Sequence, residues 1–330
     1  AGPATIEEFF TRAEGVCVDL PRARAGGLAG GMFAVFVDDP ASADALTDFD
    51  PAHAVPLPAI DPVFARTQAL AQVENLHRIA AHARGAAEVV SDVAQLERCL
   101  RDGVLAMVLH LEGAEPIGAD LEGLELFHAL GLRSLGLVWS RPNVFGHGVP
   151  FSFPNTPDTG PGLTSAGRDL VRACNRMGIA LDLSHLNQRG FDEVAVLSDA
   201  PLIATHSNAW ALCRSPRNLT DAQLDAIRAS GGIVGLNFLS AFAREDGRDV
   251  KDTPLEVFVR HVEYLVERMG IAHVGLGGDL GLPHYLPHVL QDASCYPALL
   301  GALRARGLDD EALLDLAHRN WLRVLRATWR

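Results

Sequence analysis

Short apolar runs recur along the chain and predict buried strands. These runs are rich in Val, Ile, Leu and Phe, and they lie at residues 33–37, 107–112, 134–139, 180–185, 202–207, 233–238 and 274–279. Each run is continuously apolar rather than alternating, which is typical of a strand that is covered on both faces of a parallel sheet. The pattern therefore predicts seven parallel strands.

Amphipathic segments with a helical period separate these runs, at about 63–82, 90–101, 165–177, 221–230, 254–269 and 307–326. Thr220 and Gln223 have the spacing of a capping box at a helix start. Gly178 and Gly270 stand where glycines end helices. The order of elements is therefore β-α throughout.

Repeated β-α units form either an open doubly wound sheet or a closed eight-stranded barrel. The chain has no GxGxxG after its first run and no GxxxxGK[ST], which disfavours the open nucleotide-binding sheet. We therefore expect an α/β fold of the (β/α)8 TIM-barrel type, as a single barrel domain over residues 1–330. Because only seven runs are present, we expect the first strand of the barrel to be missing from the chain.

Composition narrows the classes of partner. The 28 basic and 41 acidic side chains give a formal net charge of −13, which argues against nucleic acid as a partner. The five cysteines are scattered without CxxC spacing, so we expect neither a disulfide framework nor a cysteine zinc site. The sequence shows no membrane span, secretory signal or hydrophobic tail for a lipid anchor. We expect a cytoplasmic protein, with the periplasm left open.

Four polar residues stand at the carboxyl ends of four different predicted strands: Glu112, His185, His206 and Asp279. In a barrel these ends meet on one face, where active sites lie. Imidazole and carboxylate together suit Zn²⁺ or a related divalent ion, which acidifies a bound water and polarises a carbonyl. The pattern therefore predicts a metal-dependent hydrolase.

Other polar residues have more than one interpretation. Arg217 lies eleven residues after His206 and could bind a substrate carboxylate, although an exposed Arg paired with a neighbouring Asp is equally consistent with the spacing. His147 could reach substrate from a long loop or only pack within it. His110 should point the same way as Glu112 but one layer deeper, and we interpret it as a hydrogen-bonded core histidine. We interpret the histidines of helical segments as solvated or half-buried: His77, His82, His128, His261 and His318.

Five stretches resemble the membrane (renal) dipeptidase family of zinc metallopeptidases, which have amidohydrolase-like barrels. They are LPRARAGGLAGGMFAVFV (20–37), HLEGAEPIG (110–118), LDLSHLN (181–187), ATHSNAWALCRSPRNL (204–219) and VGLGGDL (274–280). The resemblance spans about residues 17–325. It implies a hydrolase with two zinc ions per chain that cleaves dipeptides, often with a D-residue at the C-terminal position, and it implies a homodimer.

The resemblance also implies a role for each site residue. Glu112 matches the carboxylate that bridges the two metals, and His185 and His206 match the imidazoles on one of them. Asp279 matches the acid/base that takes a proton from the metal-bridging hydroxide and gives it to the leaving amine. Arg217 matches the arginine that holds the terminal carboxylate of the dipeptide.

Three departures from the family pattern are visible. Trp139 stands near the place of a family histidine that holds the tetrahedral intermediate, and His147 is the nearby imidazole that could replace it. The last motif reads Asp279-Leu280-Gly281-Leu282 and lacks a second acid. No His precedes His53, so the His-x-Asp motif for the other metal is absent. We expect that a stretch preceding Ala1 carries it, and a variant with one metal ion is the less favoured alternative.

The sequence thus predicts metal-dependent hydrolysis of dipeptides, with Asp279 as acid/base, Arg217 and His147 in contact with substrate, and Glu112, His185 and His206 on the metal. Two alternatives stay open. One is another amidohydrolase, acting on lactones or modified amino acids. The other is a non-catalytic peptide-binding relative that lacks one metal site.

Overall fold

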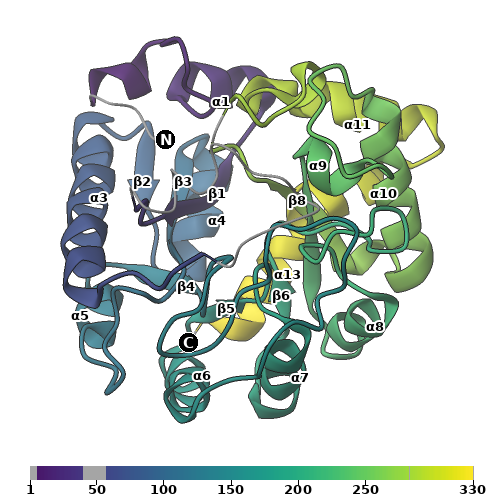
Figure 1. Ribbon diagram of the computed structural model, residues 1–330. Coiled ribbons are helices and arrows are strands. Elements are labelled where there is room, and N and C mark those ends of the chain that lie inside the picture. The colour runs from purple at the N-terminus through teal and green to yellow at the C-terminus, as the bar shows by residue number, and fades with distance from the viewer. Residues whose placement is uncertain (1–5, 40–56, 282, 330) are drawn as a thin grey trace.

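The computed structural model describes residues 6–39, 57–281 and 283–329. Eight parallel strands form one curled sheet, seen nearly end-on in Figure 1. Along the sheet the order is β1, β3, β4, β5, β6, β7, β8, and β2 pairs with the first part of β3. The strands are β1 Gly30–Val35, β2 Ala87–Val89, β3 Leu105–Glu112, β4 Leu132–Gly136, β5 Ala180–Asp182, β6 Ile203–Ala204, β7 Ile233–Asn237 and β8 Val274–Gly278. This curled parallel sheet is consistent with the predicted TIM-type barrel.

The predicted strands are found, but the count of seven was one too few. The additional strand β2 has three residues with the charged Glu88 at its centre, so it makes no apolar run. Several strands are also shorter than the apolar runs that predicted them. The run at 180–185 is a strand only as far as Asp182, because the residues after it leave the sheet and form the loops that carry polar side chains.

Helices lie outside the curled sheet (Figure 1). Their bounds are η1 Glu7–Phe10, α1 Leu20–Gly26, α3 Pro62–His82, α4 Val93–Asp102, α5 Leu124–Ala129, α6 Ser165–Met177, α7 Gln188–Leu197, α8 Asp221–Ala229, α9 Ser240–Ala243, α10 Leu255–Met269, α11 Tyr296–Ala305, α12 Asp310–Leu314 and α13 Asn320–Thr328. The capping box of Thr220 and Gln223 is confirmed at the start of α8, and Gly178 ends α6 with a left-handed φ of +67°.

Single turns interrupt the connections near the C-terminal end of the sequence. Three are 3-10 turns: η3 Ile271–His273, η4 His288–Leu290 and η5 Ala293–Cys295. A π-helical turn at Asp315–Arg319 joins α12 to α13 without a break, so the helix predicted at 307–326 is found with this irregular turn inside it. Among the helices described, none is long and apolar enough to cross a bilayer.

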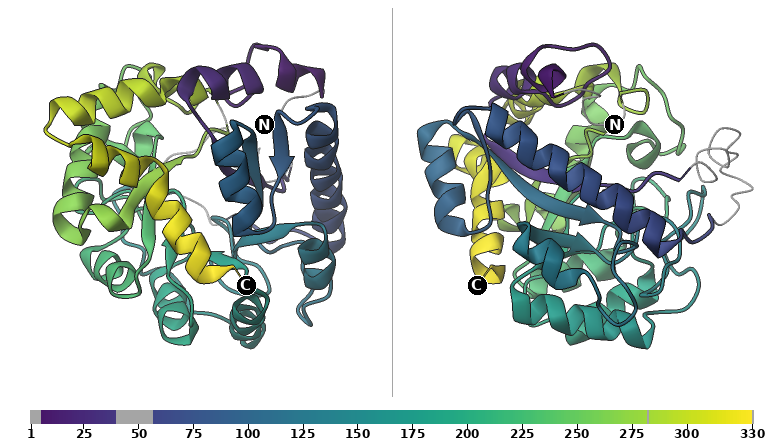
Figure 2. Two further views of the ribbon diagram at one scale, coloured as in Figure 1. Left: turned by 180° about the vertical axis from the view of Figure 1, so that it is seen from behind. Right: turned by 90° about the vertical axis from the view of Figure 1, so that its left-hand side faces the viewer.

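The helix α13 closes the amino-terminal end of the sheet, behind the view of Figure 1 (Figure 2). Val324 and Leu325 pack in one apolar cluster with Ala180, Ile203 and Ile233, the first residues of three neighbouring strands. Burial of such side chains stabilises a fold by about 1.5–3 kcal/mol each. Because this end is apolar and covered, the polar strand ends gather at the opposite, carboxyl-terminal end.

One helical histidine differs from its prediction. His261 of α10 is 1% exposed, so its interpretation as solvated or half-buried was wrong. The ring accepts a hydrogen bond from the Ala209 N–H at 3.2 Å and donates one to the Ala243 carbonyl at 2.9 Å. Burial lowers the pKa of His261 to about 4, and the neutral ring fits this donor and acceptor pair.

Candidate metal centre

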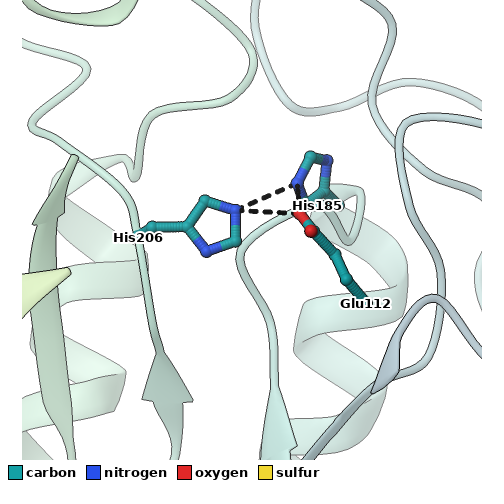
Figure 3. Close-up of side chains that lie close together, drawn as sticks. All are labelled: Glu112, His185 and His206. Carbon is teal, nitrogen blue, oxygen red and sulfur yellow. Dashed lines mark hydrogen bonds and ion pairs between the residues drawn. The ribbon is translucent and has the colours of Figure 1, made fainter. Parts of the chain in front are cut away.

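Three side chains converge at the carboxyl-terminal end of the sheet (Figure 3). Glu112 is the last residue of β3, while His185 and His206 lie just after β5 and β6. The Nε2 atoms of the two imidazoles are 3.1 Å apart. Oε1 of Glu112 lies 3.0 Å from Nε2 of His185 and 3.3 Å from Nε2 of His206. Three of the four predicted strand-end residues therefore meet at one point.

These three residues fit a divalent metal ion. One ligand atom from each lies within 4.8 Å of the others, and among the residues described no other group of three does so. Two imidazole nitrogens and one carboxylate oxygen are a usual donor set for zinc. The side chains are at most 14% exposed. Nδ1 of each imidazole already has a hydroxyl partner, so Nε2 is the atom that faces the centre.

Protonation at this centre is set by burial and by mutual contact. Burial alone would raise the pKa of Glu112, but hydrogen bonds from His185 and His206 hold it well below its usual range. Burial and the Arg217 charge lower the pKa of His185 to about 3. Burial lowers the pKa of His206, but the carboxylates of Asp279 and Glu112 raise it by more, so its pKa lies above the usual value. The carboxylates of Glu112 and Asp279 therefore favour positive charge at His206, and a bound cation would be favoured by the same carboxylates.

Beneath the imidazoles lies Asp182, the last residue of β5, which is 4% exposed. It accepts hydrogen bonds from the backbone N–H of Ser184 (3.1 Å) and Thr205 (2.8 Å) and from their hydroxyls (both 2.6 Å). Burial raises the pKa of Asp182, but His206, His110 and these hydroxyls lower it by more. This buried carboxylate joins the two segments that carry His185 and His206.

Sequence reasoning passed over Asp182 and the hydroxyls that contact the ligands. Oγ of Ser140 lies 2.8 Å from Nδ1 of His185, and Oγ1 of Thr205 lies 2.7 Å from Nδ1 of His206. The available signal was a carboxylate within the apolar run LDL, and a hydroxyl residue directly before a strand-end histidine. His110 was predicted better. Its Nδ1 lies 2.9 Å from Oγ of Ser134, which confirms a hydrogen-bonded core histidine.

Asp279 follows β8 directly, in a tight turn. Gly278 and Asp279 have φ angles of +66° and +56°, and the Asp279 N–H donates to the Gly277 carbonyl at 2.7 Å. A left-handed conformation is uncommon outside glycine and concentrates at functional sites. The carboxylate accepts a hydrogen bond from Nδ2 of Asn237 at 3.0 Å. Asn237 was not predicted, although it is the polar end of the apolar run IVGLN.

Arg217 is 2% exposed, so its interpretation as an exposed surface arginine was wrong. The guanidinium donates to the backbone carbonyls of Ser184 and His206, the latter at 3.3 Å, and stacks over the Phe242 ring at 5.4 Å. Its Nε has no hydrogen-bond partner in the part of the chain that is described. Burial lowers its pKa, while Asp279 and Glu112 act in the opposite direction. The guanidinium is thus fixed on the segments that carry the two candidate histidine ligands.

His147 lies in a loop that packs on the His185 segment. The His147 carbonyl accepts from the Asn187 N–H at 3.2 Å, and the Val149 N–H donates to the His185 carbonyl at 2.9 Å. The structure places this backbone beside the centre, but the His147 ring is not one of the three groups that converge there. Its contact with substrate stays a prediction.

Trp139 borders the centre more closely. Its ring centroid is 5.8 Å from that of His185, 4.9 Å from Phe36 and 5.2 Å from Phe151. Arg141 stacks on its ring at 4.8 Å. A half-buried indole therefore lies against a candidate metal ligand.

Comparison with known proteins identifies the family. The sequence profile of the membrane dipeptidases, peptidase family M19, matches residues 6–329. The chain belongs to the membrane dipeptidase family. A Klebsiella pneumoniae protein described as "Uncharacterized protein in pqqA 5'region" is 49% identical over 260 residues, covering 78% of this chain and 95% of that relative. Dipeptidase tcpJ of Claviceps purpurea is 31% identical, over 77% of this chain and 58% of its own length.

Solved structures agree with this membership. A metallo peptidase from Rhodobacter sphaeroides, liganded with a phosphinate mimic of the dipeptide L-Ala-D-Ala, is 48% identical with a TM-score of 0.94, over 98% of this chain and 93% of that one. A structure described as dipeptidase AC of family M19 is 48% identical with a TM-score of 0.93, over 99% and 94% of the two chains. The resemblance found in the sequence motifs is therefore confirmed, and so are the amidohydrolase-like fold and the metallopeptidase family.

Proposed function

We propose that this chain hydrolyses dipeptides at a metal centre held by Glu112, His185 and His206. The observation that carries the proposal is the convergence of these three side chains in a chain of the M19 family. The Rhodobacter sphaeroides relative, liganded with a mimic of L-Ala-D-Ala, supports dipeptides with a C-terminal D-residue as substrates. We propose zinc as the metal, because two imidazoles and a carboxylate are ligands it favours.

A divalent ion held by Glu112, His185 and His206 would supply acidification of a water molecule and polarisation of a carbonyl. The chain's own residues supply the other steps. Asp279, fixed by Asn237, takes a proton from the attacking water and delivers it to the departing amine. Arg217 binds the C-terminal carboxylate through charge-assisted hydrogen bonds, from a guanidinium already oriented by two backbone carbonyls. His147 and Trp139 border the bound substrate.

Several finer expectations remain part of this proposal. The resemblance implies two zinc ions per chain, and the described residues contribute one group of three ligands. A homodimer, a cytoplasmic location and a single domain over residues 1–330 also stay predictions. Analytical ultracentrifugation and metal analysis of the purified protein measure the oligomeric state and the number of metal ions per chain.

The test is a substrate panel with the zinc-loaded protein. Dipeptides with L- and D-residues at the C-terminal position are compared with N-acyl amino acids and lactones. The proposal expects turnover of dipeptides, and faster turnover when the C-terminal residue is D. Turnover of lactones or N-acyl amino acids alone would favour another amidohydrolase reaction. Stoichiometric zinc uptake without any turnover would favour a peptide-binding relative.

A further inference from the structure

The hydroxyl of Thr205 stands between a buried carboxylate and a candidate metal ligand. Its Oγ1 lies 2.6 Å from Oδ2 of Asp182 on one side and 2.7 Å from Nδ1 of His206 on the other. Asp182, Thr205 and His206 are all less than 9% exposed. The three groups form a chain of short hydrogen bonds in a site where exchange with solvent is limited.

The direction of these hydrogen bonds follows from a count of protons. Asp182 accepts hydrogen bonds from two backbone N–H groups and from the Ser184 hydroxyl, which is the environment of a carboxylate anion, so the single hydroxyl proton of Thr205 is donated to it. Thr205 Oγ1 is then left with lone pairs toward His206 and must accept from Nδ1. The neighbouring hydroxyl of Ser184 also lies 3.3 Å from Oγ1 of Thr205, but its proton is donated to the other oxygen of Asp182, Oδ1, at the shorter distance of 2.6 Å, so it does not change this count.

A proton on Nδ1 decides which nitrogen is free for a metal ion. A neutral imidazole carries one proton, so protonation of Nδ1 leaves the lone pair on Nε2. Nε2 is the atom that lies 3.3 Å from Glu112 and 3.1 Å from Nε2 of His185 (Figure 3). The lone pair therefore points at the centre where the three candidate ligands meet.

We propose that Thr205 and Asp182 act as a positioning pair that fixes the metal-binding tautomer of His206. This inference rests on the metal centre proposed above, and it names two residues that set the affinity of that centre for a metal ion. The tautomer of one ligand is controlled from the neighbouring strand, because Asp182 ends β5 while Thr205 follows β6. Partners of this kind typically contribute 10- to 100-fold to metal affinity.

His185 provides an internal comparison. Its Nδ1 also faces a hydroxyl, Oγ of Ser140 at 2.8 Å, and within the described residues that hydroxyl has no second partner. The Ser140 proton is therefore free to point toward Nδ1 or away from it, so Ser140 does not select a tautomer. Removal of the Ser140 hydroxyl should weaken metal binding less than removal of the Thr205 hydroxyl.

The experiment measures zinc affinity by competition with a chromogenic chelator. Thr205→Val keeps the shape of the side chain and the backbone hydrogen bond to Asp182, but it loses the hydroxyl. We expect its zinc affinity to fall by about 10- to 100-fold. Ser140→Ala should show a smaller loss, and Thr205→Ser should retain the wild-type affinity. Equal affinity in Thr205→Val and wild type would overturn the proposal.

A second measurement uses only the wild-type protein, so it does not depend on whether a variant folds. Long-range ¹H–¹⁵N spectra of the zinc-loaded wild-type protein should show the ring of His206 protonated at Nδ1 and ligated through Nε2. Ligation through Nδ1 would overturn the positioning role even if the protein is active. Failure of the wild-type protein to bind any zinc would instead contradict the metal centre itself, so the two failures are distinguishable.

Discussion

The side-chain amide of Asn237 donates a hydrogen bond to the carboxylate of Asp279 at 3.0 Å and thereby joins the ends of β7 and β8. Asn237 is fully buried, and its Oδ1 accepts from the Leu239 N–H at 2.7 Å, so the amide cannot rotate freely. The same amide nitrogen lies 3.4 Å from the His206 carbonyl. The orientation of Asp279 is therefore coupled to the segment that carries a candidate metal ligand.

Asn237→Ala tests this coupling. Loss of the amide frees the Asp279 carboxylate, and displacement of a catalytic group by about 1 Å can cost 100-fold in rate. We expect kcat for dipeptides to fall by roughly 10- to 100-fold with a smaller change in KM. Asn175→Ala is a matched control, because Asn175 is also buried and hydrogen-bonded but lies in α6. An equal kcat loss in both variants would indicate a general effect of destabilisation.

Asp279→Asn tests the acid/base role without a change of backbone. Asparagine tolerates the left-handed conformation that Asp279 adopts at φ +56°, so the melting temperature should change little. Loss of a general acid/base typically lowers the rate by 10²–10⁴-fold. Measured kcat values should fall in this range, whereas the exposed Asp246→Asn variant should keep wild-type activity. Retention of full activity in Asp279→Asn would assign proton transfer to another group.

Arg217 can be tested by changing the substrate as well as the protein. If the guanidinium binds the terminal carboxylate, the wild-type protein should bind a C-terminally amidated dipeptide more weakly than the free dipeptide. The Arg217→Met variant should bind the amidated and the free dipeptide with similar affinity. For the free dipeptide we expect Arg217→Met to raise KM by about 10-fold or more, the scale of a lost charge-assisted hydrogen bond. Additive effects of the amide and the substitution would mean that Arg217 acts only through the carbonyls of Ser184 and His206.

Metal binding should also be visible as a gain in stability. A ligand that binds only the folded state stabilises it by about 2.7 kcal/mol at 100 times its Kd. Zinc should therefore raise the melting temperature of chelator-treated wild-type protein, and removal of the metal should abolish activity. Glu112→Gln removes the one carboxylate of the centre and should abolish most of this rise. His77→Asn, on the exposed side of α3, should respond to zinc as the wild-type protein does.

The three candidate ligands were predictable because they obey a simple positional rule. Glu112, His185 and His206 each end or closely follow a buried strand, and the ends of parallel strands meet on one face. The rule needs only the apolar runs and no knowledge of contacts. It also places Asp279 on that face, although the left-handed turn that carries the carboxylate is visible only in the structure.

The supporting residues were not predictable in the same way. The hydrogen bond from Thr205 to Asp182 depends on the register of β5 and β6, in which Asp182 pairs with Ile203. A sequence does not contain that register, because a shift by one residue would turn each side chain to the opposite face. Strand β2 was not predicted, for a different reason. With Glu88 in its centre it is held by pairing with β3 rather than by an apolar pattern.

His261 makes the stability of the fold depend on pH. Its pKa is lowered from an ordinary 6.5 to about 4 by burial, so between these values the unfolded chain binds a proton that the folded protein excludes. The free energy of unfolding must then decrease as pH falls from about 6.5 to about 4, by about 3 kcal/mol from this group. Protonation of Nδ1 would also set two donors against each other, since Nδ1 accepts from the Ala209 N–H.

His261→Gln isolates this contribution. Glutamine offers an acceptor and a donor but does not titrate in this range, so the variant should lose less stability on acidification than the wild-type protein. Urea unfolding of both proteins from pH 4.5 to 7.5 in the presence of chelator measures the difference, because His185 and the other groups titrate in both and cancel. The two curves of unfolding free energy should converge as the pH falls. Curves that stay parallel over this range would show that His261 is protonated equally in the folded and unfolded states. The neutral ring between Ala209 and Ala243 would then not be the source of the acid sensitivity.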